Sequence, residues 1–361
     1  MPKRIVYITY GQFGYVVGSL YYAKYLNQLG YKVGIICADA GKPKIEAPKG
    51  VDVFYVSLER CKGGFEKRRT FIKYCKSHKK NFDIFIIRYF QLCSTLVLFL
   101  KDKYAYIDYR TGMIGRGRCV TFLYNLFNRI EMIFARKVFI LSEELAKDLW
   151  LPKRKYLWLP LGADDLSSGM PKEYKDNLNL LYIGTLSRRD LEESVIGFAK
   201  FYNEYKTHYK SLSYHIVGRG SGTDIKLLND TIQKNKMQDI VIFHGSMSHK
   251  EAQSLFDHCN CGVAYVPETF YYDHQPSTKI FEYNLSGLIC IATSTTENLK
   301  AINKTNGILC HSNPESSYDA LTSLYLHRDY FNWSDIRKSQ ELYSWTNIVK
   351  RVFDTEFKSL Y

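Results

Sequence analysis

The chain of 361 residues lacks any apolar run approaching the roughly 18 residues that a membrane-spanning helix needs. The nearest such stretch is 92–100. An apolar leader is also missing, because the first expected strand is reached by Ile5, so we expect a cytoplasmic protein. Low-complexity tracts and long charge blocks are absent, and Gly plus Pro number only 32. We therefore expect the whole chain to fold.

Cysteine is present, but not at the spacing of a disulfide framework or a metal site. Nine cysteines, an odd number, are scattered through a chain large enough to build its own cores. The closest pair, Cys259 and Cys261, has no second pair and no histidine at ligand spacing. We expect free buried thiols, a reducing compartment and no structural metal.

The excess positive charge lies in one half of the chain. Residues 1–168 carry 29 Lys and Arg against 14 Asp and Glu, a net charge of +15, whereas the remainder carries 21 against 22. This imbalance predicts that the first half faces something anionic. A basic surface without any partner is the simpler alternative.

Apolar runs typical of buried strands alternate with helix-length segments in both halves. In the first half these runs lie at 4–10, 31–38, 53–56, 84–87, 105–107 and 138–141. In the second half they lie at 179–183, 213–217, 240–243, 261–266 and 289–292. The alternation predicts an α/β fold with two doubly wound parallel sheets.

The strongest loop composition lies at 159–171, so we place the domain boundary there. We expect an N-terminal domain at 1–165 and a C-terminal domain at 172–335. The last segment, 336–361, is expected to form a terminal helix that packs across onto the N-terminal domain. Its apolar residues at helical spacing are Trp345, Ile348, Val349, Val352, Phe353 and Phe357.

Basic and small residues follow the strands of the second half. Arg188 and Arg189 come after the first of these strands, Gly218 ends the second and His244 follows the third. Ligands bind beyond the carboxyl ends of parallel strands, and an arginine fork suits phosphate oxygens. A glycine such as Gly218 lets the backbone approach a ligand closely. The alternatives are a solvated loop for the arginines and a structural role for His244.

The most specific stretch is 276–287. Ser277 or Thr278 can cap a helix whose free N–H groups attract a diphosphate. Lys279 falls in the first turn, where a cation is unfavourable unless an anion lies nearby. Glu282 falls one turn later on the same face, where it could accept hydrogen bonds from ribose hydroxyls. An exposed Lys–Glu pair is the alternative.

These motifs together resemble the nucleotide-sugar-binding domain of glycosyltransferase family 4. The resemblance covers about 180 residues and is carried by 184–189, 217–220, 243–245 and 276–287; the N-terminal half resembles the family more weakly, at 11–18, 141–145 and 159–164. It implies two Rossmann-like domains facing across a cleft, the GT-B fold. It also implies metal-independent transfer of a hexose, with retention, from a nucleotide-diphosphate sugar to a glycan or lipid-linked acceptor in polysaccharide or glycolipid synthesis. No cofactor other than the donor substrate is expected.

By this resemblance, Arg189, Lys279 and Glu282 act in catalysis. The expected donor contacts are Gly14, Gly184, Arg188, Arg189, Gly218, His244, Ser277, Thr278, Lys279 and Glu282.

Three positions depart from the family pattern. Thr185 stands where many members have arginine, and His274 stands where they often have a first glutamate. The sugar contacts are then left to Asp273, His274 or Gln275. Arg110 is our substitute for a histidine that family members often present on the acceptor side.

Three other functions are weighed against this one. A nicotinamide dehydrogenase is disfavoured because Gly11, Gly14 and Gly18 do not have the dinucleotide spacing. A sugar-nucleotide epimerase of the same fold stays open, since it would use the same donor. Nucleic-acid binding fits the basic half, but no recognisable reading module is present, so no specific nucleic acid is expected.

One helical segment, 122–134, interleaves aromatic residues with Arg129. It is expected either to face the core or to lie on a membrane as an amphipathic helix. Its apolar face would contain Leu123, Leu126, Phe127, Ile130 and Phe134. Basic clusters at 67–69, 79–80 and 153–155 favour peripheral contact with an anionic membrane, on its inner face.

Overall fold

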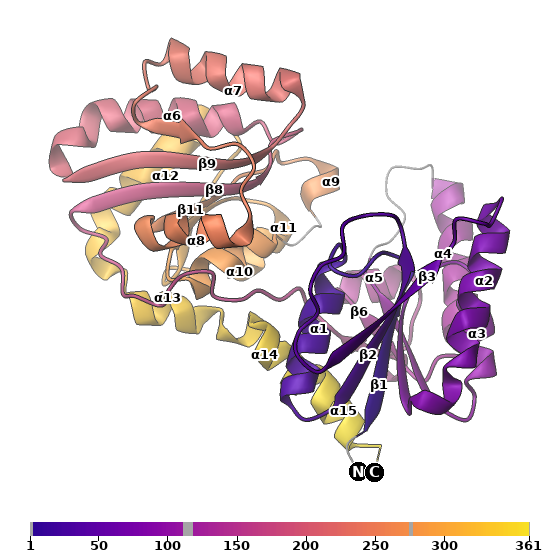
Figure 1. The fold of residues 1–361 in the computed structure, drawn as a ribbon. Coiled ribbons are helices and arrows are strands. Elements are labelled where there is room, and N and C mark those ends of the chain that lie inside the picture. The colour runs from indigo at the N-terminus through magenta and orange to yellow at the C-terminus, as the bar shows by residue number, and fades with distance from the viewer. Residues whose placement is uncertain (1–2, 111–117, 274–276, 361) are drawn as a thin grey trace. The chain divides into compact units, whose positions relative to one another are not determined.

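The computed structural model describes residues 3–110, 118–273 and 277–360, which divide into two compact units (Figure 1). The N-terminal unit combines Met1–Pro160 with Trp345–Tyr361, and the C-terminal unit is Leu161–Ser344. Each unit is built on one parallel sheet with helices on both faces. The predicted fold class, two doubly wound α/β domains, is confirmed.

The N-terminal unit contains a seven-stranded sheet in the order β3-β2-β1-β4-β5-β6-β7. Its strands are β1 Arg4–Thr9, β2 Lys32–Asp39, β3 Val51–Ser57, β4 Ile84–Arg88, β5 Tyr104–Tyr109, β6 Val138–Ile140 and β7 Tyr156–Trp158. The direction of chain progression reverses between β1 and β4. Both strands are apolar along their length because helices cover both faces of the sheet.

Two helical layers cover this sheet. One face carries α2 Gly64–Ser77, α3 Ser94–Phe99, α4 Arg118–Ile133 and α5 Glu143–Asp148. The other face carries α1 Val17–Gln28, α14 Trp345–Ile348, the wider helical turn Val349–Asp354 and α15 Thr355–Lys358. Figure 1 shows α2, α3 and α4 side by side within this unit.

The C-terminal unit contains a six-stranded sheet in the order β10-β9-β8-β11-β12-β13. Its strands are β8 Asn177–Thr185, β9 Ser211–Arg219, β10 Val241–Phe243, β11 Cys261–Ala264, β12 Ile289–Thr293 and β13 Gly307–Cys310. One face packs against α6 Leu191–Tyr205, α7 Gly222–Lys234, α12 Pro314–His327 and α13 Trp333–Ser339. The other face packs against α8 His249–His258 and α10 Thr278–Leu285, while α9 Phe270–Asp273 and α11 Thr296–Ala301 are short helices.

The final segment is not one continuous helix, which corrects that part of the prediction for 336–361, but the stretch from Trp345 does pack onto the N-terminal unit, as predicted. Helix α13 ends at Ser339 and belongs to the C-terminal unit, whereas the helical stretch from Trp345 belongs to the N-terminal unit. The break occurs because the chain at 343–344 pairs outside the helix: the Tyr343 carbonyl accepts a hydrogen bond of 3.0 Å from the Ala163 N–H. The Tyr343 ring also stacks on Phe281, at 4.4 Å between centroids.

The cysteines are free thiols, and seven of the nine are buried. Cys259 and Cys261 are both among the buried ones, as predicted. Within the described residues, no helix is long and apolar enough to cross a membrane.

Candidate functional site

The candidate site lies where chain progression reverses in the C-terminal sheet, between β8 and β11. These strands are parallel neighbours, and Cys261 pairs with Leu180 in their register. The chain leaving β8 enters α6 on one face, whereas the chain leaving β11 leads to α10 on the other. Such a divergence opens the crevice in which α/β domains bind ligands.

Lys279, in the first turn of α10, lies over the end of β8. A Cβ atom on Gly184 would approach Lys279 Cε to 2.6 Å, so glycine at this position leaves space for the lysine stem. Lys279 Nζ lies 4.0 Å from the centroid of the Tyr182 ring. The structure therefore brings Gly184 and Lys279 together across 95 positions of sequence.

The electrostatic surroundings of Lys279 are cationic. The pKa of its ammonium is lowered to about 7, first by burial and then by the Arg189 guanidinium, while Glu282 opposes both effects. Among the described residues, Lys279 Nζ has no carboxylate oxygen within the 4.0 Å of an ion pair. A bound anion between the two cations would relieve this penalty.

Arg189 occupies the turn that follows β8. Its Cζ lies 4.5 Å from the centroid of the Tyr272 ring, and its Nε is buried without a hydrogen-bond partner among the described residues. The turn is tight, since Arg188 and Asp190 have left-handed φ angles of 58° and 49°. Non-glycine residues adopt such angles at some energetic cost, and they gather at functional sites. The Arg188 side chain is exposed.

Glu282 lies one helical turn after Lys279, as its spacing predicts. Burial raises the pKa of its carboxyl group, Lys279 opposes this effect, and Asp164 raises the pKa again. In the described part of the chain no residue donates a hydrogen bond to this carboxylate. It can therefore accept hydrogen bonds from ligand hydroxyl groups.

Two aromatic residues of the site were missed by sequence reasoning. Tyr182 and Tyr272 are the rings beneath the Lys279 and Arg189 cations. Tyr272 also donates a 3.1 Å hydrogen bond to the Arg188 carbonyl and so joins the two loops. Tyr182 had a detectable signal, because it points to the same face of β8 as Gly184 two positions later.

The N-terminus of α10 lacks a side-chain cap. Ser277 is the N-cap residue, but its side chain makes no capping hydrogen bond, and Thr278 is the first helical residue. His274 and Gln275 lie outside the described residues. Asp273 is held by Thr296, whose backbone N–H and hydroxyl donate to its carboxylate at 2.8 Å and 2.7 Å.

Gly218 and His244 are brought to the same sheet edge, but they contact protein groups. A Cβ atom on Gly218 would lie 1.9 Å from the Gly184 carbonyl oxygen, so this glycine permits the approach of neighbouring strands. The prediction that Gly218 also lets a ligand approach the backbone stays a prediction. His244 Nε2 lies 2.9 Å from His215 Nδ1 with the rings stacked, and burial lowers the pKa of His244. This pairing favours the structural role.

The two predicted residues of the N-terminal unit lie at the carboxyl ends of β1 and β5. Arg110 pairs with Asp108 at 2.6 Å and donates to the Leu159 carbonyl at 2.7 Å and to the Tyr22 hydroxyl. Three contacts therefore fix the guanidinium within its own unit. Gly14 has a φ angle of 85°, and a Cβ atom there would meet the Ile45 side chain at 2.5 Å.

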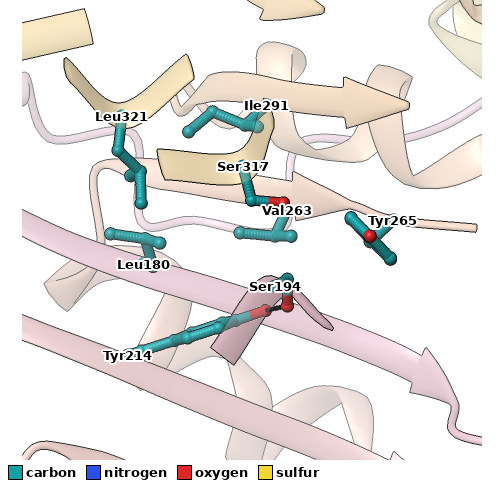
Figure 2. Close-up of a pocket in the computed structure, with 8 residues that line it drawn as sticks. All are labelled: Leu180, Ser194, Tyr214, Val263, Tyr265, Ile291, Ser317 and Leu321. Atoms are coloured by element: carbon teal, nitrogen blue, oxygen red, sulfur yellow. Dashed lines mark hydrogen bonds between the residues drawn. The ribbon is translucent and has the colours of Figure 1, made fainter. Parts of the chain in front are cut away.

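A small cavity lies inside the C-terminal core, between the sheet and α6 and α12 (Figure 2). Its volume is about 10 Å³, which is room for about one water molecule. The Ser194 and Tyr214 hydroxyls in its wall are hydrogen bonded to each other at 3.1 Å. It is too small for a substrate, so the reversal point of the sheet is the better candidate.

Comparison with known proteins identifies the architecture. No protein-family model and no curated protein sequence matches the chain. Solved structures do match over nearly the whole chain. Sucrose-phosphate synthase from Thermosynechococcus elongatus superposes with a TM-score of 0.68 at 16% identity, covering 99% of both chains. A glycosyltransferase from Rickettsia africae gives a TM-score of 0.70 at 16% identity, covering 99% of this chain and 97% of that one.

A third match is the Anabaena protein HepE in complex with UDP and glucose, with a TM-score of 0.66 at 11% identity, covering 99% and 100% of the two chains. The chain has the GT-B fold. At these identities the likeness establishes the glycosyltransferase-like fold and not the substrates.

Proposed function

We propose that this GT-B protein is a retaining glycosyltransferase of family 4 that transfers a hexose from a nucleotide-diphosphate sugar. The observation that carries the proposal is the placement of Lys279 beside Arg189 without an ion-pairing carboxylate for the lysine in the described chain. Two cations held together at a sheet edge destabilise the empty protein. A diphosphate between them removes that cost.

Each part of the donor has a matching group. The diphosphate would bind between Lys279 and Arg189, next to the first turn of α10, whose N-terminus has no side-chain cap and attracts anions. The ribose hydroxyls fit the Glu282 carboxylate, which accepts no hydrogen bond from other described residues. UDP-glucose is the first donor to test, because HepE was solved in complex with it.

The same groups support the chemical step. As the sugar–phosphate bond breaks, negative charge grows on the leaving diphosphate, and Lys279, Arg189 and the helix N-terminus stabilise that charge. The acceptor hydroxyl attacks from the face of departure, and the leaving phosphate accepts its proton. Retention follows without a protein nucleophile. The acceptor is a glycan or a lipid-linked sugar of cell-surface polysaccharide or glycolipid synthesis, met in the cytoplasm or at the inner face of the membrane.

Thermal melts with a panel of nucleotide sugars test donor binding. A true donor at 100 times its Kd should stabilise the protein by about 2.7 kcal/mol. The Lys279→Met variant should fold but lose this stabilisation. If no nucleotide sugar raises the wild-type melting temperature, the proposed donor site is wrong.

Product analysis distinguishes the transferase from an epimerase of the same fold. With donor and acceptor present, proton NMR of early product should show the anomeric configuration of the donor. An epimerase would convert donor without any acceptor. An inverted anomer would contradict the assignment to family 4.

A further inference from the structure

Helix α4 turns polar side chains toward the protein and apolar side chains toward solvent. Its buried positions include polar side chains, Asn125, Asn128 and Glu131, which recur every three residues. A helix that merely covers a sheet has the opposite pattern, with apolar residues inward. Of the two alternatives for this segment, the one in which its apolar face packs into the core is therefore wrong.

The inward polar residues are held by specific hydrogen bonds. Asn128 accepts a hydrogen bond from the Tyr89 hydroxyl and donates one of 2.8 Å to the Tyr109 hydroxyl. Glu131 accepts a 3.1 Å hydrogen bond from the Ser94 hydroxyl. Because buried polar groups are costly without partners, these bonds fix which side of α4 faces inward.

The opposite side of the helix is exposed and apolar. Leu123 is 64% exposed and Ile133 is 58% exposed. Trp150, from the turn after α5, extends the surface and contacts the Phe122 ring at 5.3 Å between centroids. We call this surface the α4 face; it comprises Val120, Phe122, Leu123, Leu126, Phe127, Ile130, Ile133, Phe134 and Trp150.

Basic residues border the α4 face. Lys155 Nζ donates to the carbonyl oxygens of Ile133 and Ala135, which places the basic run Lys153–Lys155 at the end of the helix. Arg68 lines a groove together with Leu123 and Phe127. The whole N-terminal unit carries 32 Lys and Arg against 14 Asp and Glu, a net charge of +18, whereas the C-terminal unit is at −4.

We propose that the α4 face docks the N-terminal unit onto an anionic bilayer surface. The apolar side chains enter the boundary between head groups and acyl chains, and the neighbouring Arg and Lys side chains contact anionic head groups. The 16 residues of α4 are too few to span a bilayer, so the helix lies in the plane of the interface. A second copy of the chain is a poorer occupant, because it would bring two units of charge +18 together.

Co-sedimentation with vesicles tests this surface without any sugar donor. The wild-type chain should pellet with vesicles of phosphatidylcholine and phosphatidylglycerol at low salt, and less so as salt rises. The variant L123Q/F127Q/I130Q keeps good helix formers but removes apolar area, so we expect its partitioning to fall about tenfold or more. The matched control L299Q/L326Q/L342Q changes three similarly exposed leucines of the C-terminal unit and should partition like the wild type.

Further measurements distinguish binding of the α4 face to an anionic membrane from binding to a second copy of the chain. The R68Q/R154Q variant should show a weaker dependence on anionic lipid. Light scattering should show the same oligomeric state for the wild type and L123Q/F127Q/I130Q, and donor-induced stabilisation should be unchanged in that variant. Equal vesicle binding by wild type and variant would overturn the proposal. So would equal recovery with neutral and anionic vesicles, or a wild-type dimer that the substitutions dissociate.

Discussion

Lys279 holds its ammonium over the ring of Tyr182, with Nζ 4.0 Å from the ring centroid at the carboxyl end of β8. The interaction with the ring offsets only part of the cost of burying a cation. The positive charge of Arg189 adds to that cost rather than reducing it. The placement of Lys279 therefore costs stability in the empty protein, and such a cost is typical of active sites.

Lys279→Met should stabilise the empty protein and abolish donor binding. Because the folded-state pKa is lowered to about 7, the unfolded chain binds more protons between pH 7 and the ordinary lysine value. The substitution therefore raises the free energy of unfolding by its full amount below pH 7, and this increase fades as pH rises toward about 10.5. We expect a gain of about 1 to 3 kcal/mol, or several degrees in Tm.

The matched control for this variant is Lys300→Met, which removes an exposed lysine paired with Glu297 in the same unit. It should leave Tm and donor affinity nearly unchanged. Scanning calorimetry at pH 6 and pH 9 measures the difference. A lower Tm for Lys279→Met at pH 6 would contradict the burial of an unpaired charge.

Donor binding should draw a proton onto Lys279 near neutral pH. The lysine is about half protonated at pH 7 in the empty protein, and the diphosphate raises its pKa on binding. Donor Kd should be nearly constant below pH 7 and rise up to about tenfold per pH unit above it. Titration calorimetry of UDP-glucose in two buffers of different ionisation enthalpy should show about half a proton taken up at pH 7 and nearly one at pH 8. No proton uptake at either pH would refute this coupling.

The sequence was enough to propose candidate residues for the site, but not the contacts between them. The carboxyl ends of parallel strands are recognisable from apolar runs, so Arg189, Lys279 and Glu282 could be proposed as site residues from the sequence. The contact of Lys279 with Gly184 and Tyr182 depends on the order of β8 and β11 in the sheet, which periodicity does not encode. The same is true of Arg189 beside Tyr272.

The fold was predicted except where local patterns are obscured by turn-forming residues or symmetrical. Strands β7 and β13 were not predicted, although β6 and β10 are equally short and were. The residues after β7 include Pro160 and Gly162, and β13 begins at Gly307, so turn-forming residues obscure both strands. The spacing in α4 defines one apolar stripe, but it does not say whether that stripe faces in or out. The orientation is set by the hydrogen bonds of Asn128 to two tyrosines. Tyr89 comes directly after β4, and Tyr109 is the last residue of β5.

Glu282→Gln should weaken recognition of the ribose while preserving the fold. The substitution keeps the shape but replaces a carboxylate acceptor with a weaker amide, so we expect a loss of about 1.5 to 3 kcal/mol in kcat/KM. Burial raises the pKa of Glu282, so Tm should be unchanged or slightly higher.

A donor analogue provides the control. The wild type should bind UDP-glucose more tightly than its 2′-deoxyribose analogue, and Glu282→Gln should lose much of that preference. Equal discrimination by both proteins would place the ribose elsewhere. Glu315→Gln, on α12 of the same unit, should behave like the wild type.

Gly218→Ala should destabilise the C-terminal unit and disturb the donor site. The new methyl group would lie 1.9 Å from the Gly184 carbonyl oxygen, so β8 and β9 must move apart. Overpacking against backbone typically costs about 1 to 3 kcal/mol, and we expect the upper end because no flexible side chain can yield. If the strands move apart, Gly184 shifts and so does the backbone that contacts the Lys279 side chain, so donor Kd should rise.

Gly222→Ala is the control, since nothing lies within 4 Å of its Cβ position at the start of α7. Alanine there should be neutral or stabilising by up to about 1 kcal/mol. Denaturant unfolding of both variants, with donor titrations of the folded proteins, makes the comparison. If Gly218→Ala unfolds and binds donor like the wild type, the close packing of these two strands does not support the site.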